Sequence, residues 1–472
     1  MQWATVARGA TAALHRSGLA APHRPAPRAR AARLADPMSA TGGDDGLLPP
    51  RDATRERFLL ALGRGAAVAA LIGALVSPPL VNVATLVLLV SVLLLPSARV
   101  RLQRLLAMPV AQATLLLLAV LAVATLWSAA PWVDRWKAWW DWRPLLAMLL
   151  CLTVFDDAAR RRGLVIFVAA VAVAAAYSFW AWSQGISPTG RDHGLPGIVA
   201  RNPVTQGMGF AAACFLALML VLGQRDFDRR ARFLLAAAAV FILANLVFVT
   251  SGRTGHVMLL ILLASAGIQL LAGWRRAAVI VALPLLAALA FALSPMLQTR
   301  FGQMIDELHE PLAAENITSM GIRTVMWRVS FDLARERPVL GYGMGGFPAA
   351  YDKTIKQSAY KGWAATPTVD PHNQYLQVHL QAGLAGSVAF LWFLLSVLRV
   401  RGGRPYSAWA RSLLLGWCAA ALATSVFTTF AESHLLMLLL GLLLPGVDGE
   451  LQAAHASRAI AVSREGAAAA RS

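Results

Sequence analysis

The 472-residue chain has few charged residues and almost no cysteine. Asp, Glu, Lys and Arg make up only 14% of it, too few to cover a water-soluble globule of this length. The three cysteines, Cys151, Cys214 and Cys418, fall inside apolar runs and lack metal-ligand spacing. No HExxH or paired-Cys pattern occurs either. We therefore expect no disulfide, no metal cluster and no cofactor.

A nucleotide-binding loop is also missing. The stretch GYGMGGF at 341–347 superficially resembles a phosphate loop. No Lys-Ser/Thr follows it, however, and no βαβ pattern surrounds it. The sequence thus gives little support to nucleotide chemistry.

Hydrophobic residues are abundant and make up 58% of the chain. A bilayer core about 30 Å thick needs roughly 20 apolar residues per helix, and such runs recur between Phe58 and Pro445. Because the runs are continuous and not alternating, they predict helices and not barrel strands. We predict an all-α polytopic membrane protein with about twelve transmembrane helices, at 58–76, 79–96, 110–128, 140–156, 163–183, 204–223, 232–250, 254–272, 276–295, 373–398, 408–429 and 432–447.

The rest of the chain divides around these spans. Residues 1–57 are rich in Arg, Ala, Pro and Gly and read as a disordered cytoplasmic tail, and 448–472 as a second cytoplasmic tail. Spans one to nine occupy 58–295, and spans ten to twelve occupy 372–447. Between them, 296–371 is predicted to form a long loop on the outer side of the membrane, with helical patterning. Loops of this length are usually functional, and we expect this one to carry short helices and to pack over the bundle.

The net charge of +19 raises the question of a nucleic-acid partner. In a multi-spanning protein, however, arginine mostly records topology, because Lys and Arg are retained in cytoplasmic loops. With both tails inside, the inner loops hold Arg99, Arg101, Arg104, Arg160, Arg161, Arg162, Arg225, Arg229, Arg230, Arg232, Arg275, Arg276, Arg399, Arg401, Arg404 and Arg411. The short outer loops hold only Arg135, Lys137, Arg143, Arg191, Arg201 and Arg253. This bias favours the topology and argues against nucleic acid.

Six tryptophans crowd the stretch 126–144, at Trp127, Trp132, Trp136, Trp139, Trp140 and Trp142. Tryptophan belts commonly lie at the lipid headgroup level, where the ring is apolar and its N–H stays wet. Stacking on a sugar, or a lipid-tail entrance, is the functional alternative.

Several arginines remain on the predicted outer side. Arg253 lies in a short turn with Gly252 and Gly255, either as a cation that snorkels to the interface or as a ligand-binding group of a polar cavity. Arg191 and Arg201 flank another outer loop. Guanidinium groups that share one space suit a phosphate or diphosphate, because each can bind two oxygens. Singly, each arginine is equally well explained as a surface charge.

His372 opens a predicted span. Asp370 is expected to cap this helix and Pro371 to fit its first turn, which would place His372 at the helix N-terminus. The helix dipole and nearby arginines would favour a neutral imidazole, which can accept a proton from a hydroxyl. The alternative is a hydrogen-bonded capping residue without a chemical role.

These motifs, in their order, resemble the bacterial O-antigen ligase family, which is grouped with O-antigen polymerases and protein O-oligosaccharyltransferases. The chain has SGRTG after one span and RTVMWRVSFDLARERPVLGYGMGGF in the long loop, and HNQYLQVHLQAGLAG opens the next span. The shared pattern is carried by Arg323, Trp327, Pro338, Gly341, Gly343, His372, Asn373, Leu376 and Gly383.

The resemblance implies a metal-independent, GT-C-like glycosyltransferase of the bacterial inner membrane with a periplasmic active site. The donor would be a glycan on undecaprenyl diphosphate, and the acceptor a sugar hydroxyl of lipid A-core oligosaccharide. His372 would be the base, and Arg253 with one of Arg191 or Arg201 would bind the diphosphate. Arg323 and Asn373 are further expected substrate contacts. Since the matched residues include no carboxylate nucleophile, direct attack would invert the anomeric centre.

Three other functions stay open. An O-antigen polymerase would use the same donor with a second lipid-linked glycan as acceptor, and a protein O-oligosaccharyltransferase would use a protein. A lipid or glycan transporter belongs to a different class and would favour charges at the membrane midplane and inverted repeats. The sequence shows no convincing repeat, and its candidate charges lie on one side.

Overall fold

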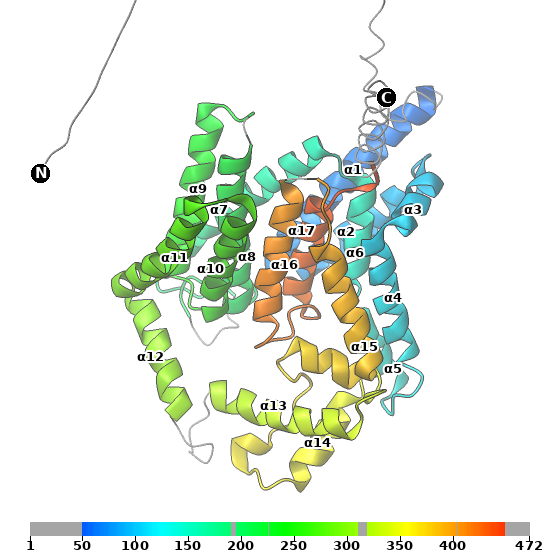
Figure 1. Cartoon of the computed structure of the whole chain (residues 1–472), viewed down its shortest axis with the longest axis vertical. Helices are drawn as coiled ribbons and strands as arrows, with labels where there is room; N and C mark the ends of the chain where they lie inside the picture. Colours follow the sequence, from blue (N-terminus) through cyan, green and yellow to red (C-terminus); the bar gives the residue numbers. More distant parts are fainter. Residues whose placement is uncertain (1–49, 190–194, 225, 310–318, 404, 449–472) are drawn as a thin grey trace, which may run out of the picture. The chain divides into compact units, whose positions relative to one another are not determined.

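The computed structural model describes residues 50–189, 195–224, 226–309, 319–403 and 405–448. Within these ranges the chain is helical and contains no strand (Figure 1). Most of both predicted tails, together with Arg225 and Arg404, lies outside the described residues. The helices are α1 (Pro50–Val76), α2 (Pro78–Leu93), α3 (Ala98–Ala107), α4 (Pro109–Val123), α5 (Trp132–Trp140), α6 (Pro144–Val154), α7 (Asp157–Ser183), α8 (Pro203–Gly223), α9 (Arg229–Phe248), α10 (Arg253–Leu270), α11 (Trp274–Leu293), α12 (Pro295–His309), α13 (Ser319–Glu336), α14 (Phe347–Gln357), a short 3-10 helix (Gly362–Ala365), α15 (Gln374–Leu398), α16 (Tyr406–Ala420) and α17 (Phe430–Leu443).

Seven of the described helices are long and apolar enough to cross a membrane, namely α1, α7, α8, α9, α10, α11 and α15. The count rises to eight if α2 and α3, which meet at 105°, form one broken span. Each of the twelve predicted spans coincides with a helix, but α4, α6, α16 and α17 have only 15, 11, 15 and 14 residues. This architecture is that of a multi-pass membrane protein, and twelve crossings stay a prediction.

Several helix ends differ from the predicted ones. Helix α1 begins at Pro50, so residues 50–57, assigned to the tail by the sequence, are helical. Helix α16 ends at Ala420, although the apolar composition of 421–429 predicted a helix through that stretch. The backbone there bonds to α15 instead: Gln374 N donates to Ala421 O at 2.9 Å. A tertiary contact thus replaces the last two turns of the expected span.

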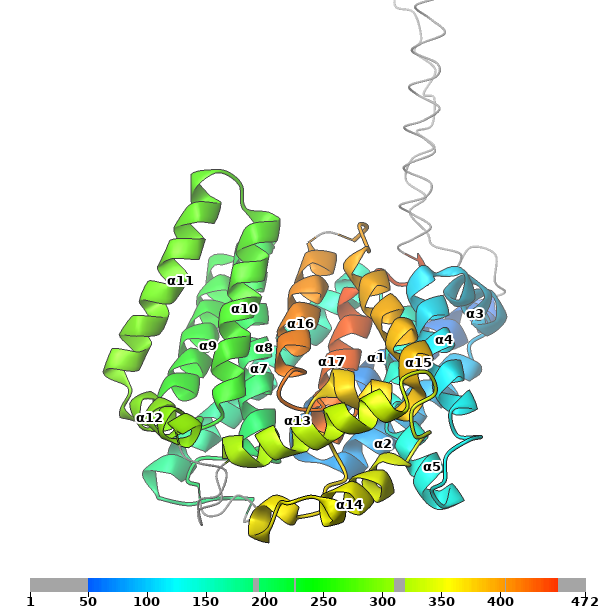
Figure 2. The ribbon, with the colours of Figure 1, turned by 60° about the horizontal axis from the view of Figure 1, so that its bottom comes forward.

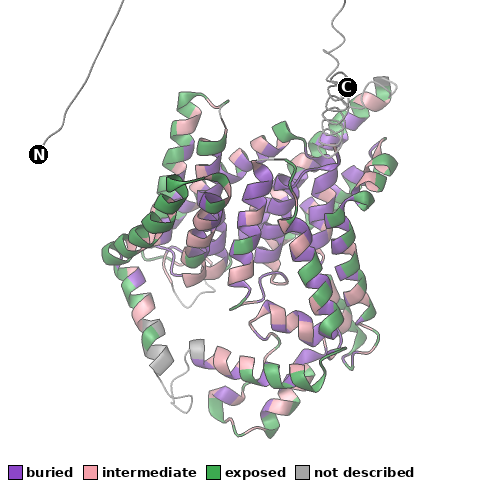
Figure 3. Ribbon diagram, viewed as in Figure 1, coloured by how far each residue is buried: buried purple, intermediate pink, exposed green. Residues whose placement is uncertain are grey.

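The described core centres on α8 and α17. Almost every α17 side chain is buried, and α8 is buried along most of its length. Helix α11, in contrast, has no buried residue, and Figure 3 shows it exposed along its length. Because lipid is as apolar as a protein core, an exposed apolar helix such as α11 fits a bilayer and not water.

The arginine-rich helix ends gather at one end of the described bundle. Arg101 of α3 pairs with Asp448 beyond α17 at 2.8 Å, and Arg160 of α7 donates to Leu444 O at 2.9 Å. Arg64 of α1 pairs with Asp156 at 2.6 Å. These contacts join several helix ends that the charge bias had assigned to one side. We call this the arginine-rich end.

Helix α15 is broken in its middle at Ala382 and Gly383, where Gly383 has φ +56°. The loop at 338–344 fills the break: Leu384 N donates to Pro338 O at 3.0 Å, and Tyr342 N donates to Leu380 O at 2.7 Å. A Cβ on Gly383 would lie 2.1 Å from Val339 O. The glycines of GYGMGGF therefore serve close backbone packing: a Cβ on Gly341 would lie 2.6 Å from Leu380 O.

We expect Gly383→Ala to destabilise the protein by about 2 kcal/mol or more, because the left-handed backbone alone costs a non-glycine residue about 1–3 kcal/mol. The clash with Val339 O adds to this. Thermal unfolding in detergent measures the effect. Gly65→Ala at an exposed position of α1, where nothing lies within 4 Å of the new Cβ, is the matched control and should not lower stability. Equal stability of the two variants would contradict the packing described here.

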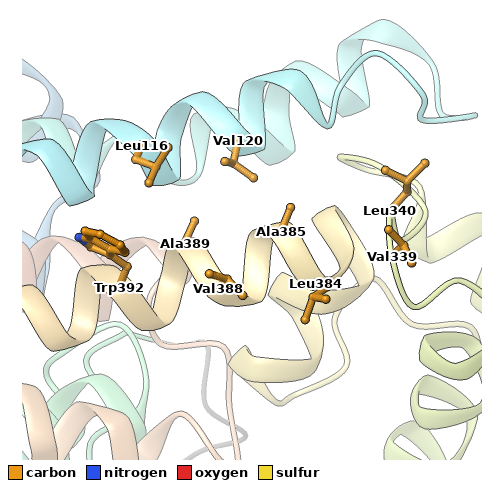
Figure 4. A pocket seen from close by; sticks show the side chains of 9 residues that line it. All are labelled: Leu116, Val120, Val339, Leu340, Leu384, Ala385, Val388, Ala389 and Trp392. Atoms are coloured by element: carbon orange, nitrogen blue, oxygen red, sulfur yellow. The ribbon is translucent and has the colours of Figure 1, made fainter.

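An apolar groove of about 470 Å³ lies between α4 and the second half of α15, with the 338–344 loop at one end. Figure 4 shows Leu116 and Val120 of α4 facing Ala385, Ala389 and Trp392 of α15. None of its lining residues is acidic or basic. The groove offers hydrocarbon contact but no group for acid–base chemistry.

Candidate active site

His372 lies in the loop between the 3-10 helix and α15, with φ +50°. It is the one non-glycine residue with positive φ among the described residues. Its backbone N donates to Asp370 Oδ1 at 2.7 Å, a turn in which an Asp side chain accepts from the N–H two residues on. The same oxygen accepts from Ser425 Oγ at 2.6 Å. The backbone of His372 is therefore fixed from two parts of the chain.

The predicted cap of the helix after His372 is wrong. Asn373, not Asp370, is the N-cap of α15, and Pro371 precedes the helix. Asn373 Oδ1 accepts from Tyr375 N at 3.0 Å and Leu376 N at 3.1 Å, and its Nδ2 donates to Leu422 O at 3.0 Å. Asp370 is instead occupied by His372 N and Ser425. Both side-chain groups of Asn373 thus bond within the protein, and its contact with substrate stays a prediction.

Helix α13 lies beside this loop. Trp327 Nε1 donates to the backbone O of His372 at 3.3 Å. Arg323, one helical turn earlier, interacts electrostatically with His372. Apolar residues of α13, including Val329 and Leu333, share a buried cluster with Leu376 and Leu380 of α15. Figures 1 and 2 show α13 beside the first half of α15.

The surroundings of His372 favour its neutral form. Burial is the largest cause that lowers the pKa of His372; Asp370 opposes it, and Arg323 lowers the pKa further. Its Nδ1 is buried and has no hydrogen-bond partner among the described residues. A half-buried neutral imidazole with an available nitrogen is suited to accept a proton from a hydroxyl. The sequence had predicted this protonation state, but with a helix N-terminus as one of its causes.

The pKa shift predicts how activity depends on pH. If neutral His372 is the base, kcat/KM falls only when the imidazole is protonated, below the ordinary histidine value of about 6.5. Because Arg323 lowers the pKa, Arg323→Gln should raise it and move the acidic limb of the profile to higher pH. A profile measured on both proteins checks the sign. An acidic limb that stays in place, or moves to lower pH, would contradict the assignment.

Arg253 and Arg201 lie on neighbouring helix ends. Arg253 is the first residue of α10, and Arg201 precedes the Asn202 cap of α8. These ends touch closely, since a Cβ on Gly252 would lie 2.4 Å from Pro203 O. The glycines that flank Arg253 therefore allow contact between helices. Arg191 lies outside the described residues.

Segment 421–432 runs from the end of α16 into α17. It contacts both the loop that carries His372 and helix α8, which follows Arg201. Ser425 donates to Asp370, and Phe427 N donates to Gln374 Oε1 at 2.9 Å on the His372 side. On the other side, Glu432 accepts a hydrogen bond from Thr205 of α8. The beginnings of α8, α10, α15 and α17 therefore lie at one end of the bundle, which we call the His372 end.

Sequence reasoning missed parts of this site. Trp327 was noticed only as a motif residue, although its spacing of four from Arg323 places both on one helix face. Ser425 and Glu432 gave no local signal, because they lie in or beside an apolar run. Within the described ranges, no group of three or more His, Cys, Asp or Glu residues could hold a metal ion.

Comparison with known proteins adds an independent observation. Residues 238–391 match the family model described as O-antigen ligase (Wzy_C). The matched stretch contains Arg253, Arg323, Trp327 and His372, whereas Arg201 and segment 421–432 lie outside it. No curated protein matches the chain. Residues 238–391 are thus similar to the O-antigen ligase family.

Proposed function

We propose that this protein is an O-antigen ligase, which transfers a glycan from undecaprenyl diphosphate to a sugar hydroxyl of lipid A-core oligosaccharide. The observation that carries the proposal is the cluster around His372. It places a neutral imidazole nitrogen beside a permanent cation, at the mouth of a helix long and apolar enough to cross a membrane. The family match over residues 238–391 supports a lipid-linked glycan as the substrate.

In this mechanism His372 accepts the proton of the acceptor hydroxyl. The hydroxyl oxygen then forms the new bond to the anomeric carbon, and the bond from that carbon to the diphosphate oxygen breaks. Arg253 and Arg201 stabilise the negative charge of the departing lipid diphosphate. The donor is already activated by its diphosphate, so the protein needs only charge and a base. A single displacement of this kind inverts the anomeric centre.

The topology is part of the proposal. We infer that α4, α6, α16 and α17 cross the inner membrane with the seven longer helices and the α2–α3 pair, so that the arginine-rich end faces the cytoplasm. The His372 end then faces the periplasm. Labelling by a membrane-impermeant thiol reagent tests this in intact cells. A cysteine at exposed Val369 should react, and one at exposed Arg57 should not. The reverse pattern would overturn the proposed orientation.

A transfer assay tests the activity. Purified protein receives labelled lipid-linked glycan with lipid A-core, with a second lipid-linked glycan, or with pilin, without added metal or nucleotide. We expect the label to move to lipid A-core. Label that extends the carrier-bound glycan would establish a polymerase, and label on pilin a protein O-oligosaccharyltransferase. Glycan export that His372→Ala leaves intact, with no transfer product, would establish a transporter.

A further inference from the structure

A basic pocket lies at the arginine-rich end, where the proposed chemistry has no part. Its volume is about 410 Å³, and it is lined by Arg161, Arg162, Val165 and Ile166 of α7 and by Asp226 and Phe227, which precede α9. Helices α7 and α9 pack side by side (Figures 1 and 2), and the pocket lies near their N-terminal ends. Positive charge and hydrocarbon surface therefore meet in one place.

The two arginines of this pocket keep N–H groups that the protein does not use. The neighbouring Arg160 is buried and donates to Leu444 O. Arg161, in contrast, is partly exposed and donates to Asp226 at 3.1 Å. Arg162 is exposed and has no hydrogen bond or ion pair within the described ranges. Because a guanidinium has five N–H donors and two arginines outnumber one aspartate, the pocket is suited to an anion.

An exposed apolar stripe of α7 leads away from the pocket. Ile166, Ala169 and Val173 follow Arg162 at helical spacing, so the four residues lie on one face of α7. All four are exposed. From Arg162 to Val173 the helix rises about 16 Å, close to half of a hydrocarbon core about 30 Å thick. The stripe is therefore as long as the acyl chains of one leaflet.

An anionic phospholipid combines the chemistry of the pocket with that of the stripe. Its headgroup phosphate accepts hydrogen bonds from guanidinium groups, and its acyl chains cover apolar helix surface. A soluble anion would use only the arginines, and a lipid without net charge would use mainly the stripe. Basic pockets between membrane helices are known to hold anionic headgroups in this way.

We propose that this pocket binds an anionic phospholipid from the leaflet at the arginine-rich end. Arg162 and the remaining N–H groups of Arg161 bind the headgroup phosphate. The Arg161 guanidinium lies 5.7 Å from the centre of the Phe227 ring, which limits the orientations that it must give up on binding. One acyl chain lies along the stripe from Ile166 to Val173. The bound lipid is not a substrate, and the proposal does not depend on the proposed transfer reaction.

Lipid titration tests the proposal with two variants of opposite expected sign. The full-length protein in detergent receives phosphatidylglycerol or phosphatidylcholine, and bound lipid is measured by native mass spectrometry. We expect tighter binding of phosphatidylglycerol. Arg162→Gln should weaken it about 5-fold, the usual contribution of one arginine near an anionic lipid surface. Asp226→Asn should strengthen it, because it removes the negative charge beside Arg161. The Asp226 side chain is 76% exposed, so this change should not disturb folding.

Two controls separate this site from general attraction between charges. Arg99→Gln makes the same change at an exposed arginine of α3, which lies at the arginine-rich end but does not line the pocket, so it should leave binding unchanged. Glycerol phosphate carries the anion without acyl chains and should not displace phosphatidylglycerol at equal concentration; displacement would assign the pocket to a soluble anion and overturn the proposal. Equal affinity for the two lipids, wild-type binding by Arg162→Gln, an equal loss with Arg99→Gln or weaker binding by Asp226→Asn would overturn it as well.

Discussion

Replacing His372 is expected to lower kcat for glycan transfer by about 10²–10⁴-fold, the usual contribution of a general base. The best variant is His372→Asn. Asparagine tolerates the positive φ of this position, so the variant keeps the loop conformation while it removes the imidazole. The contacts from Trp327 and Asp370 are to backbone atoms of His372 and survive the change. Initial rates with labelled lipid-linked glycan measure the loss.

His379→Asn is the matched control for this prediction. His379 lies on α15, the helix that follows His372, and its Nδ1 is 3.0 Å from Ser387 Oγ across the break in that helix. It has no part in the proposed proton transfer, so its replacement should change kcat less than 10-fold. A His372→Asn protein that reaches the membrane in normal amount and keeps more than one tenth of wild-type activity would remove His372 from the mechanism.

Arg253→Ala has the second largest expected effect, a loss of about 10²–10³-fold in kcat, typical of a group that stabilises charge in the transition state. Arg253 begins α10, where the helix dipole and the first backbone N–H groups also favour an anion. The close approach of Gly252 to Pro203 fixes this helix end against α8. The backbone that carries the Arg253 guanidinium is thus held in place. This limits the reorganisation of the side chain that is needed when negative charge develops on the diphosphate.

Two variants make this prediction specific. Arg253→Lys keeps the charge but loses the fork that binds two oxygens, so it should recover only part of the activity. Arg275→Ala removes an exposed arginine on α11, which the charge bias placed on the opposite side, and should leave the rate unchanged. Lipopolysaccharide ladders in complemented cells, together with rates in vitro, check all three proteins. A normal ladder with Arg253→Ala would contradict the assigned role.

The helices were largely predictable, because the thickness of the bilayer sets how many apolar residues each span needs. A run of about 20 apolar residues spans the hydrocarbon core whatever its neighbours are, and each predicted span coincides with a helix. The break of α15 at Ala382–Gly383 was not predictable, since it falls inside such a run. It depends on backbone bonds with the facing loop, in which Pro338 O accepts from Leu384 N and Tyr342 N donates to Leu380 O.

The candidate site, too, was only partly predictable from the sequence. His372, Arg253 and Arg323 were identified from their order and their position at span ends, and the structure places His372 beside Arg323. Their roles in catalysis and binding stay predictions. The prediction that Asp370 caps the next helix was wrong, because its carboxylate bonds to Ser425, more than fifty residues away. Ser425 and Glu432 had no local signal at all.

By itself, the sequence determined that the chain is helical, that many of its helices are apolar enough for a lipid bilayer, and which helix ends carry arginine. These properties follow from apolar content and charge, which act locally. Only the tertiary structure decided where α15 breaks and α16 stops, which carboxylate holds the backbone of His372, and that Glu432 bonds to Thr205. The physical reason is that a polar group buried away from water takes whichever partner the fold brings within hydrogen-bond distance, and that partner can come from any part of the chain.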